Sequence, residues 1–227
     1  MTQTMPAHDE PPQEKSGIVA EARKLGITEL LHFTTKFGLV GVLGSSCVKS
    51  RRRLPQDAYV EFVYTPNCSK RYETDEWLDY VNLSISRIND WMLNCSMRWH
   101  RGEEAGFWCV LAFNVEIIGD PGVYITTTNN CYPSVLRQPG FSGLREAFAE
   151  TVAGRYGNLI ARSADHNQNW PTDRQAEVLY PGELYLDRLD SIYVSCDEDA
   201  DEVHAIWAGA TPGWTTAPVK VAPEVFQ

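Results

Sequence analysis

The chain lacks the cysteine and glycine motifs that mark several common protein classes. Its six cysteines form no C-x-x-C pair, and none stands at metal-binding spacing from a histidine, so no zinc site is indicated. A disulfide scaffold is not expected either, since 227 residues are enough to bury a core of their own. Neither G-x-G-x-x-G nor a Walker-type glycine loop is present, so the sequence does not support a Rossmann or P-loop nucleotide site.

Long apolar runs are also missing. The uncharged stretch at 107–113 is one of the longest, and it is far too short to span a bilayer. The N-terminus, with the polar run HDEPP at residues 8–12, has no apolar segment of the kind found in a signal peptide. The sequence therefore predicts a cytoplasmic protein that makes no membrane contact.

Positive charge is scarce, because the formal net charge is −10. Such a charge argues against diffuse, non-specific binding to nucleic acid, although it leaves room for a local basic groove. The concentrated basic spots are Arg51-Arg52-Arg53, preceded by Lys49, and Lys70-Arg71. The acidic run at 197–202 is typical of a solvated loop or a helix start.

Helical and strand-like patterns are mixed without regular βαβ alternation, which favours the α+β class. We expect residues 1–16 to be poorly ordered and residues 155–172 to be irregular. The chain divides into an N-terminal extension at 1–26, partly disordered, a main domain at 27–210 and a polar tail at 211–227. The patterns predict helices at 18–24, 36–43, 56–64, 89–99 and 144–153, and strands at 30–35, 80–85, 106–118, 123–127, 175–180 and 189–194.

The strand at 175–180 has a pattern that suggests chemistry. Side chains alternate along a strand, so Gln175 and Glu177 are expected on one face, and Pro181-Gly182 then ends the strand. A carboxylate at this place could stabilise a cationic centre that forms beside it. The alternative is an exposed edge strand with a solvated glutamate, since a Q-x-E triplet is common.

Three segments in order resemble one family. These are Leu31-His32-Phe33-Thr34 with its following helix, Asp79–Leu83 with Arg87 behind it, and Gln175–Leu179. They look like the corresponding segments of DarT-type DNA ADP-ribosyltransferases, the toxins of toxin–antitoxin pairs. The similarity runs from roughly residue 28 to residue 195.

The resemblance implies an ADP-ribosyltransferase fold, a split and bent β-sheet core with flanking helices that holds NAD as co-substrate without a metal. It implies transfer of ADP-ribose to a base of single-stranded DNA, thymine in one branch of the family and guanine in another. It also implies an antitoxin partner that reverses the modification or masks the toxin. Two alternatives stay open, namely an RNA, nucleotide or protein acceptor, and a non-catalytic nucleotide-binding module.

The resemblance assigns a role to individual residues. Glu177 matches the catalytic glutamate, which would stabilise the positive charge that develops on the ribose and act as general base. An arginine should clamp the pyrophosphate. Arg71 is the candidate for that place, and the arginines at 51–53 are its rivals. The cofactor-binding candidates are His32, Phe33, Thr34, Arg87 and Gln175.

The loop ahead of the glutamate strand normally selects the acceptor in this family. Tyr132 and Trp170 could stack an unpaired base, while Thr127 and Asn129 could hydrogen-bond its edge. Arg51 and Arg52 are candidates for the DNA phosphates. The structural alternatives are a core histidine at 32, a solvated patch at 51–53 and tryptophans that only fill space. The stretch Ser86–Met92 departs from the thymine branch, which leaves the acceptor base open.

Overall fold

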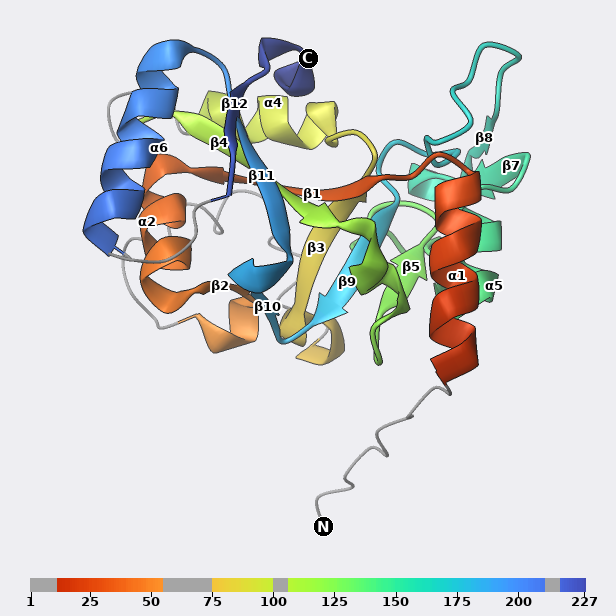
Figure 1. Cartoon of the computed structure of the whole chain (residues 1–227). Coiled ribbons are helices and arrows are strands. Elements are labelled where there is room, and N and C mark those ends of the chain that lie inside the picture. Colours follow the sequence, from red (N-terminus) through yellow and green to blue (C-terminus); the bar gives the residue numbers. More distant parts are fainter. Residues whose placement is uncertain (1–11, 55–74, 100–105, 211–216) are drawn as a thin grey trace.

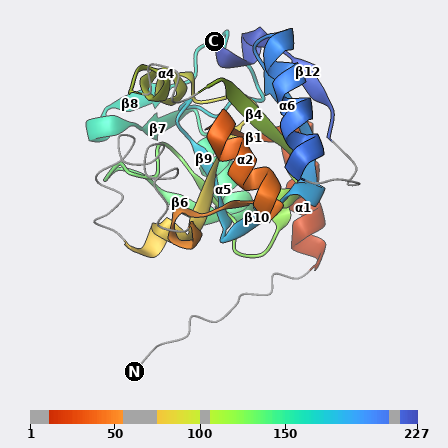
Figure 2. The same ribbon diagram turned by 90° about the vertical axis from the view of Figure 1, so that its left-hand side faces the viewer.

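The structure is a computed structural model that describes residues 12–54, 75–99, 106–210 and 217–227. The predicted helix at 56–64 and the candidate Arg71 lie outside the described residues. Figures 1 and 2 show a bent central sheet with helices on its flanks. In Figure 1 α2 and α6 lie together at one end of the sheet, and α1 and α5 lie at the other.

The central sheet has eight strands in the order β12-β11-β4-β1-β3-β9-β5-β6. Its neighbouring strands are antiparallel except for β11 and β12, which are parallel. Strands β2 and β10 form a separate pair, as do β7 and β8. The strands are β1 (Glu29–Thr35), β2 (Cys47–Lys49), β3 (Tyr80–Ile85), β4 (Trp108–Asn114), β5 (Tyr124–Thr126), β6 (Arg137–Pro139), β7 (Thr151–Ala153), β8 (Leu159–Ala161), β9 (Glu177–Pro181), β10 (Glu183–Tyr185), β11 (Leu189–Val194) and β12 (Val219–Val221).

The helices cover both faces of this sheet. None of those in the described residues is both long and apolar enough to cross a membrane. The α-helices are α1 (Pro12–Lys24), α2 (Lys36–Ser45), α4 (Asp90–Trp99), α5 (Gly140–Ala147) and α6 (Asp197–Ala210). The short 3-10 turns are η1 (Arg51–Arg53), η3 (Asp75–Asp79), η4 (Val115–Gly119), η5 (Arg155–Gly157), η6 (Leu186–Arg188) and η7 (Pro223–Phe226).

Strand β4 is apolar on both faces because both faces are covered. Its residues from Trp108 to Phe113 are all buried. Leu111 and Phe113 belong to the larger core cluster, whereas Trp108 and Val110 belong to a second cluster on the opposite face. A strand covered on both sides is continuously apolar rather than alternating, which explains the pattern at 107–113.

Strands β1 and β3 separate soon after they meet. They are paired only at Leu30 with Ile85 and at Leu31 with Ser84. On its other side β1 stays paired with β4 over its whole length, and β3 stays paired with β9. The sheet therefore splits between His32 and the first half of β3, which leaves room for a cleft.

Several predicted elements have different bounds in the structure. The predicted strand at 106–118 ends at Asn114, whose side chain accepts a hydrogen bond from the Glu116 N–H group and starts the turn η4. The helix predicted at 144–153 was wrong beyond Ala147, because residues 151–153 pair with β8 as a hairpin. That hairpin also gives regular structure to part of the stretch predicted as irregular.

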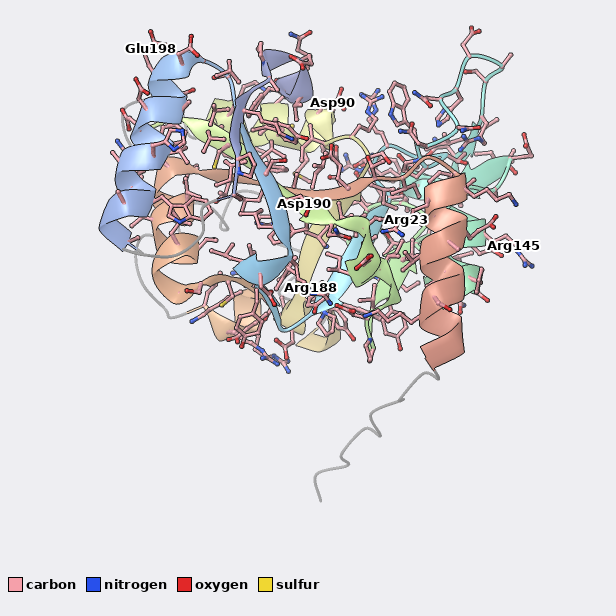
Figure 3. The ribbon with its side chains drawn as sticks, viewed as in Figure 1. Arg23, Asp90, Arg145, Arg188, Asp190 and Glu198 are labelled. Carbon is pink, nitrogen blue, oxygen red and sulfur yellow. The ribbon has the colours of Figure 1, made fainter. Side chains whose placement is uncertain are left out.

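The N-terminal helix starts earlier than predicted. Residues 12–16 were expected to be poorly ordered, but they belong to α1, which packs Ile18 and Ala22 into the main core. Figure 3 shows Arg23 on the side of α1 that faces the sheet, where it pairs with Glu116 at 2.9 Å. At the other end of the chain, Val219–Val221 of the predicted tail joins the central sheet beside β11.

Candidate active site

A cleft opens where β1 and β3 separate. His32 lies in this split, and its Nδ1 is 3.0 Å from the Asn82 carbonyl oxygen. The imidazole therefore hydrogen-bonds a backbone carbonyl of β3 at a point where β3 is no longer paired with β1. The cleft is lined by His32, Lys49, Arg51, Trp77, Leu78, Tyr80, Val81 and Asn82.

Burial favours the neutral form of the His32 imidazole in the folded protein. Burial lowers its pKa from the ordinary value, while the hydrogen bond to the Asn82 carbonyl acts in the opposite direction and is the smaller effect. With Nδ1–H donating to that carbonyl, Nε2 is an acceptor. A neutral ring of this kind is suited to hydroxyl groups rather than to phosphate.

We expect the free energy of unfolding to fall as the pH is lowered from about 7.5 to about 5.5, because the unfolded chain protonates His32 near its ordinary pKa and the folded chain does not. The stabilisation is complete above the unfolded pKa and decreases below it. His32→Gln should make this pH dependence shallower, as urea unfolding at the two pH values would measure. An equal slope in the variant would show that His32 is not held neutral by folding.

The arginine turn η1 is clamped beside the cleft by Asp79. Arg53 donates from Nε and Nη2 to the Asp79 carboxylate at 2.8 and 3.1 Å, and the Ser50 hydroxyl donates at 2.6 Å. The hydrogen bond from Arg53 is the main reason that the pKa of Asp79 is lowered. Gly182, at φ +69°, makes room for Arg53, since a β-carbon there would stand 2.6 Å from the guanidinium carbon. Arg53 thus binds Asp79, while Arg51 of the same turn lines the cleft.

We expect Asp79→Asn to lower the free energy of unfolding by about 1 kcal/mol at neutral pH, since the two partners are partly exposed and the ion pair is screened. The pKa of Asp79 is depressed by folding, so its contribution is present above about pH 4 and is lost as the pH falls through the folded value. Urea unfolding at both pH values measures this. Asp190→Asn, at an exposed position of the otherwise mostly buried strand β11 (Figure 3), is the control, and an equal loss there would contradict the clamp.

Glu177 begins β9 and is almost fully buried, with 8% of the residue exposed. Its backbone N–H group donates to the Thr126 hydroxyl oxygen at 2.8 Å, and it stands opposite Ser84 in β3. Its carboxylate Oε2 accepts a hydrogen bond of 2.8 Å from the Asn130 backbone N–H group. The glutamate is therefore held at both its main chain and its carboxylate, and it is not the solvated edge residue of the alternative interpretation.

The loop that contacts Glu177 is itself held by Arg137 of β6. Arg137 donates from Nε to the Asn130 side-chain oxygen at 2.5 Å and from Nη2 to the Asn130 carbonyl at 2.6 Å. Its guanidinium carbon lies 4.9 Å from the centre of the Trp77 ring, and Trp77 lines the cleft. One arginine thus connects the cleft wall to the loop that holds the glutamate.

Two residues of this loop were predicted to hydrogen-bond the acceptor base, and their side chains point into the loop itself. Thr127 and Asn129 are buried, and each has its side-chain oxygen engaged by a backbone N–H group, that of Leu136 and that of Cys131. The Asn129 amide nitrogen has no hydrogen-bond partner among the described residues. Direct contact of these two side chains with a base stays a prediction.

Gln175 does not share a strand face with Glu177, which corrects the sequence prediction. Its N–H group donates to the Asp173 carboxylate and that of Ala176 to the Asp173 carbonyl, so a turn precedes β9 and the strand starts at Glu177. The Gln175 side chain is nevertheless close to the loop, because its Oε1 accepts a hydrogen bond of 2.8 Å from the Tyr132 hydroxyl.

Arg87 and Trp170 lie together. The Arg87 guanidinium carbon stands 4.4 Å from the centre of the Trp170 ring, and Nη2 is 3.6 Å from Asp90. Burial would raise the pKa of Asp90, but the hydrogen bonds and charge of Arg174, together with Arg87, lower it. One face of Trp170 is therefore covered by a cation.

The structure does not bring every predicted residue to the cleft. Phe33 packs on Trp108 with ring centres 5.9 Å apart, in the second core cluster. Thr34 is buried against α2, where Gly38 makes room for its hydroxyl. Arg51 reaches the cleft, Arg52 is exposed in the same turn, and Arg71 lies outside the described residues.

Two residues of the site, Asn130 and Arg137, were not identified from the sequence. Asn130 acts through its backbone N–H group, which any residue except proline could supply. Arg137 belongs to a strand of three residues, 40 positions before Glu177, and no local pattern marks it. Only the pairing of β5 with both β6 and β9 places them beside the glutamate.

The family model that matches this chain covers residues 31–227 and is described as "ssDNA thymidine ADP-ribosyltransferase, DarT". No curated protein matches. The match confirms the family resemblance of the three sequence segments, and it extends through β12 to the end of the chain.

Solved structures of similar proteins share the fold. DarT of Thermus sp. 2.9 in complex with carba-NAD⁺ has 16% identity and a TM-score of 0.60, with 88% of this chain and 98% of that chain covered. The same protein in complex with ADP-ribosylated single-stranded DNA has 15% identity and a TM-score of 0.59, with 89% and 97% covered. Thermosipho africanus DarTG in complex with ADP-ribose has 14% identity and a TM-score of 0.57, with 87% and 50% covered. These matches confirm the predicted α+β fold.

Proposed function

Because the chain belongs to the DarT family of single-stranded DNA ADP-ribosyltransferases, we propose that Glu177 is its catalytic residue and that the cleft beside His32 holds NAD. The activity is the NAD-dependent transfer of ADP-ribose to single-stranded DNA. The observation that supports the assignment of Glu177 is its buried carboxylate, oriented by a backbone N–H group on the loop that lies between β5 and β6.

The residues of the cleft suit the chemical groups of NAD. Lys49 and Arg51 supply cations for a pyrophosphate, and Arg51 is placed by the clamp of Arg53 on Asp79. Trp77 and Tyr80 offer aromatic faces to planar rings. The neutral His32 offers Nε2 to a ribose hydroxyl. Arg71 remains a further candidate for the pyrophosphate, and we propose Arg87 as a structural partner of Trp170 rather than a cleft residue.

NAD supplies a glycosidic bond between ribose and nicotinamide, and positive charge develops on the ribose as that bond breaks. The Glu177 carboxylate stabilises this charge from a buried position, where electrostatic interactions are strong. It also accepts the proton of the attacking N–H group of the base. The new bond joins that nitrogen to the ribose carbon, and nicotinamide leaves with the electron pair of the broken bond.

We propose thymine as the acceptor, on the strength of the family description. The loop contacts of Tyr132 and Gln175 lie beside Glu177 and would shape the base site. We further propose that the chain acts as the toxin of a toxin–antitoxin pair in the cytoplasm. The similarity to Thermosipho africanus DarTG supports an antitoxin partner.

The experiment is mass spectrometry of short single-stranded oligonucleotides incubated with NAD and the protein. Each oligonucleotide carries one type of modifiable base. A mass gain of one ADP-ribose on the thymine oligonucleotide alone is the expected result. A gain on the guanine oligonucleotide alone would overturn the choice of base and keep the activity.

Consumption of NAD without any gain on DNA would point to an RNA, nucleotide or protein acceptor. RNA and protein substrates incubated with the same labelled NAD distinguish these acceptors. Binding of NAD without any consumption would overturn the catalytic assignment and favour the binding module.

A further inference from the structure

The hairpin of β7 and β8 presents two strongly exposed hydrophobic side chains. Tyr156 is 87% exposed and Leu159 is 76% exposed, the highest values among the large hydrophobic residues that the structure describes. In Figures 1 and 2 the hairpin lies at the periphery of the molecule, away from the central sheet. A single exposed hydrophobic residue is ordinary, but an aromatic and an aliphatic residue three positions apart in one hairpin, both strongly exposed, suggest a contact surface.

The tip holds Tyr156 in an unfavourable backbone conformation. Its φ is +65° and its ψ is 15°, in the left-handed region that costs a residue with a β-carbon roughly 1 kcal/mol or more. The turn is closed by hydrogen bonds between Gly157 N–H and Gly154 O and between Gly154 N–H and Asn158 O. The Ser134 hydroxyl donates to the Gly154 carbonyl at 2.7 Å and ties the tip to the loop before β6. The tyrosine is therefore fixed in an exposed position.

A series of contacts connects the tip to the catalytic glutamate. The guanidinium carbon of Arg155 lies 4.8 Å from the centre of the Tyr156 ring and 5.6 Å from the centre of the Tyr132 ring. The Tyr132 hydroxyl in turn donates to Gln175, two residues before Glu177. These contacts link the exposed tip to the segment that carries Glu177.

We propose that the hairpin tip, defined as Arg155, Tyr156 and Leu159, binds the nucleotides of single-stranded DNA that flank the modified base. This proposal rests on the proposed function. An exposed aromatic ring suits unpaired bases, since every base has a face that can stack, and Leu159 of the same hairpin adds a second exposed apolar side chain. The Arg155 cation complements a phosphate in a chain whose net charge of −10 would otherwise repel DNA.

The test compares oligonucleotides of two lengths that carry one central modifiable base, about 4 and about 15 nucleotides. Tyr156→Gly is the informative variant, because it removes the ring while glycine favours the positive φ that the hairpin requires. We expect KM for the long oligonucleotide to rise about tenfold, which corresponds to about 1.4 kcal/mol and is typical of one lost stacking contact. The kcat, the KM for NAD and the rate on the short oligonucleotide should stay unchanged. Tyr156→Trp should restore the wild-type KM.

The control is Tyr185→Ala, since Tyr185 is an exposed tyrosine on β10. An unchanged KM for the long oligonucleotide in Tyr156→Gly would overturn the proposal, and so would an equal rise on both lengths. Failure of the wild-type protein to modify either oligonucleotide would instead overturn the proposed function, and the DNA-binding role of the tip with it. The two failures are therefore told apart by the wild-type reaction.

Discussion

Glu177→Gln should lower kcat for ADP-ribosyl transfer by about 10³-fold or more while the protein stays folded. The amide oxygen of glutamine can still accept the hydrogen bond from Asn130 N–H, so the loop contact is kept and only the charge and the basic group are removed. Loss of an electrostatic stabiliser and loss of a general base each cost about 10²-fold or more. Single-turnover measurement of the mass gain on an oligonucleotide gives the rate, and urea unfolding gives the stability.

Glu183→Gln is the matched control. Glu183 lies on β10, past the turn at Gly182, and its carboxylate accepts a hydrogen bond from the Tyr185 hydroxyl. Its loss should change kcat by less than about twofold, because a group away from the reacting atoms contributes little. If Glu177→Gln were active and Glu183→Gln inactive, the catalytic carboxylate would be that of Glu183 and not that of Glu177.

Arg137→Ala should lower kcat by about 10- to 100-fold with a smaller change in the KM for NAD. Arg137 makes two hydrogen bonds to Asn130, whose N–H group orients the Glu177 carboxylate. A misplaced catalytic group can lose about 10²-fold in rate through position alone. Arg137 is thus a positioning residue, and separate measurement of kcat and KM distinguishes this role from a general loss of binding.

Two further variants sharpen this prediction. Arg137→Lys keeps the charge but lacks the planar fork that reaches both oxygens of Asn130, so we expect it to recover little of the lost kcat. Arg145→Ala is the control, because Arg145 points outward from α5 (Figure 3). Full recovery with lysine would show that the charge of Arg137 matters and that its two hydrogen bonds do not.

Part of the negative net charge is concentrated on one helix. Acidic residues begin α6 at Asp197, at the end of the molecule that also carries α2 (Figure 1). Arg137 and Arg155 contact the loop at Asn130 and Tyr132. Arg87 and Arg162 contact Trp170, and Arg174 pairs with Asp90. Several of these hold loops in place, so the local positive charge also has a structural use.

Local pattern was sufficient for much of the architecture. The β1 strand and the helix after it are adjacent in the sequence, and Thr35 caps that helix with a hydrogen bond to Gly38 N–H, so the step from strand to helix is encoded within a few residues. The same holds for α4, where Asn89 caps the first turn. The strand containing Glu177 and its end at Pro181 were likewise predicted, because both depend on near neighbours.

The sequence by itself determined the family, the order of the main strands and helices, and the glutamate that we propose as catalytic. The tertiary structure alone decided how β1 and β3 separate around His32, how the predicted tail joins β11, and how Arg137 reaches the loop of Glu177. It also placed Gln175 in a turn and Phe33 in a core cluster. The reason is physical. Periodicity and capping report on residues within one or two turns, whereas the pairing of distant strands depends on the packing of the whole chain.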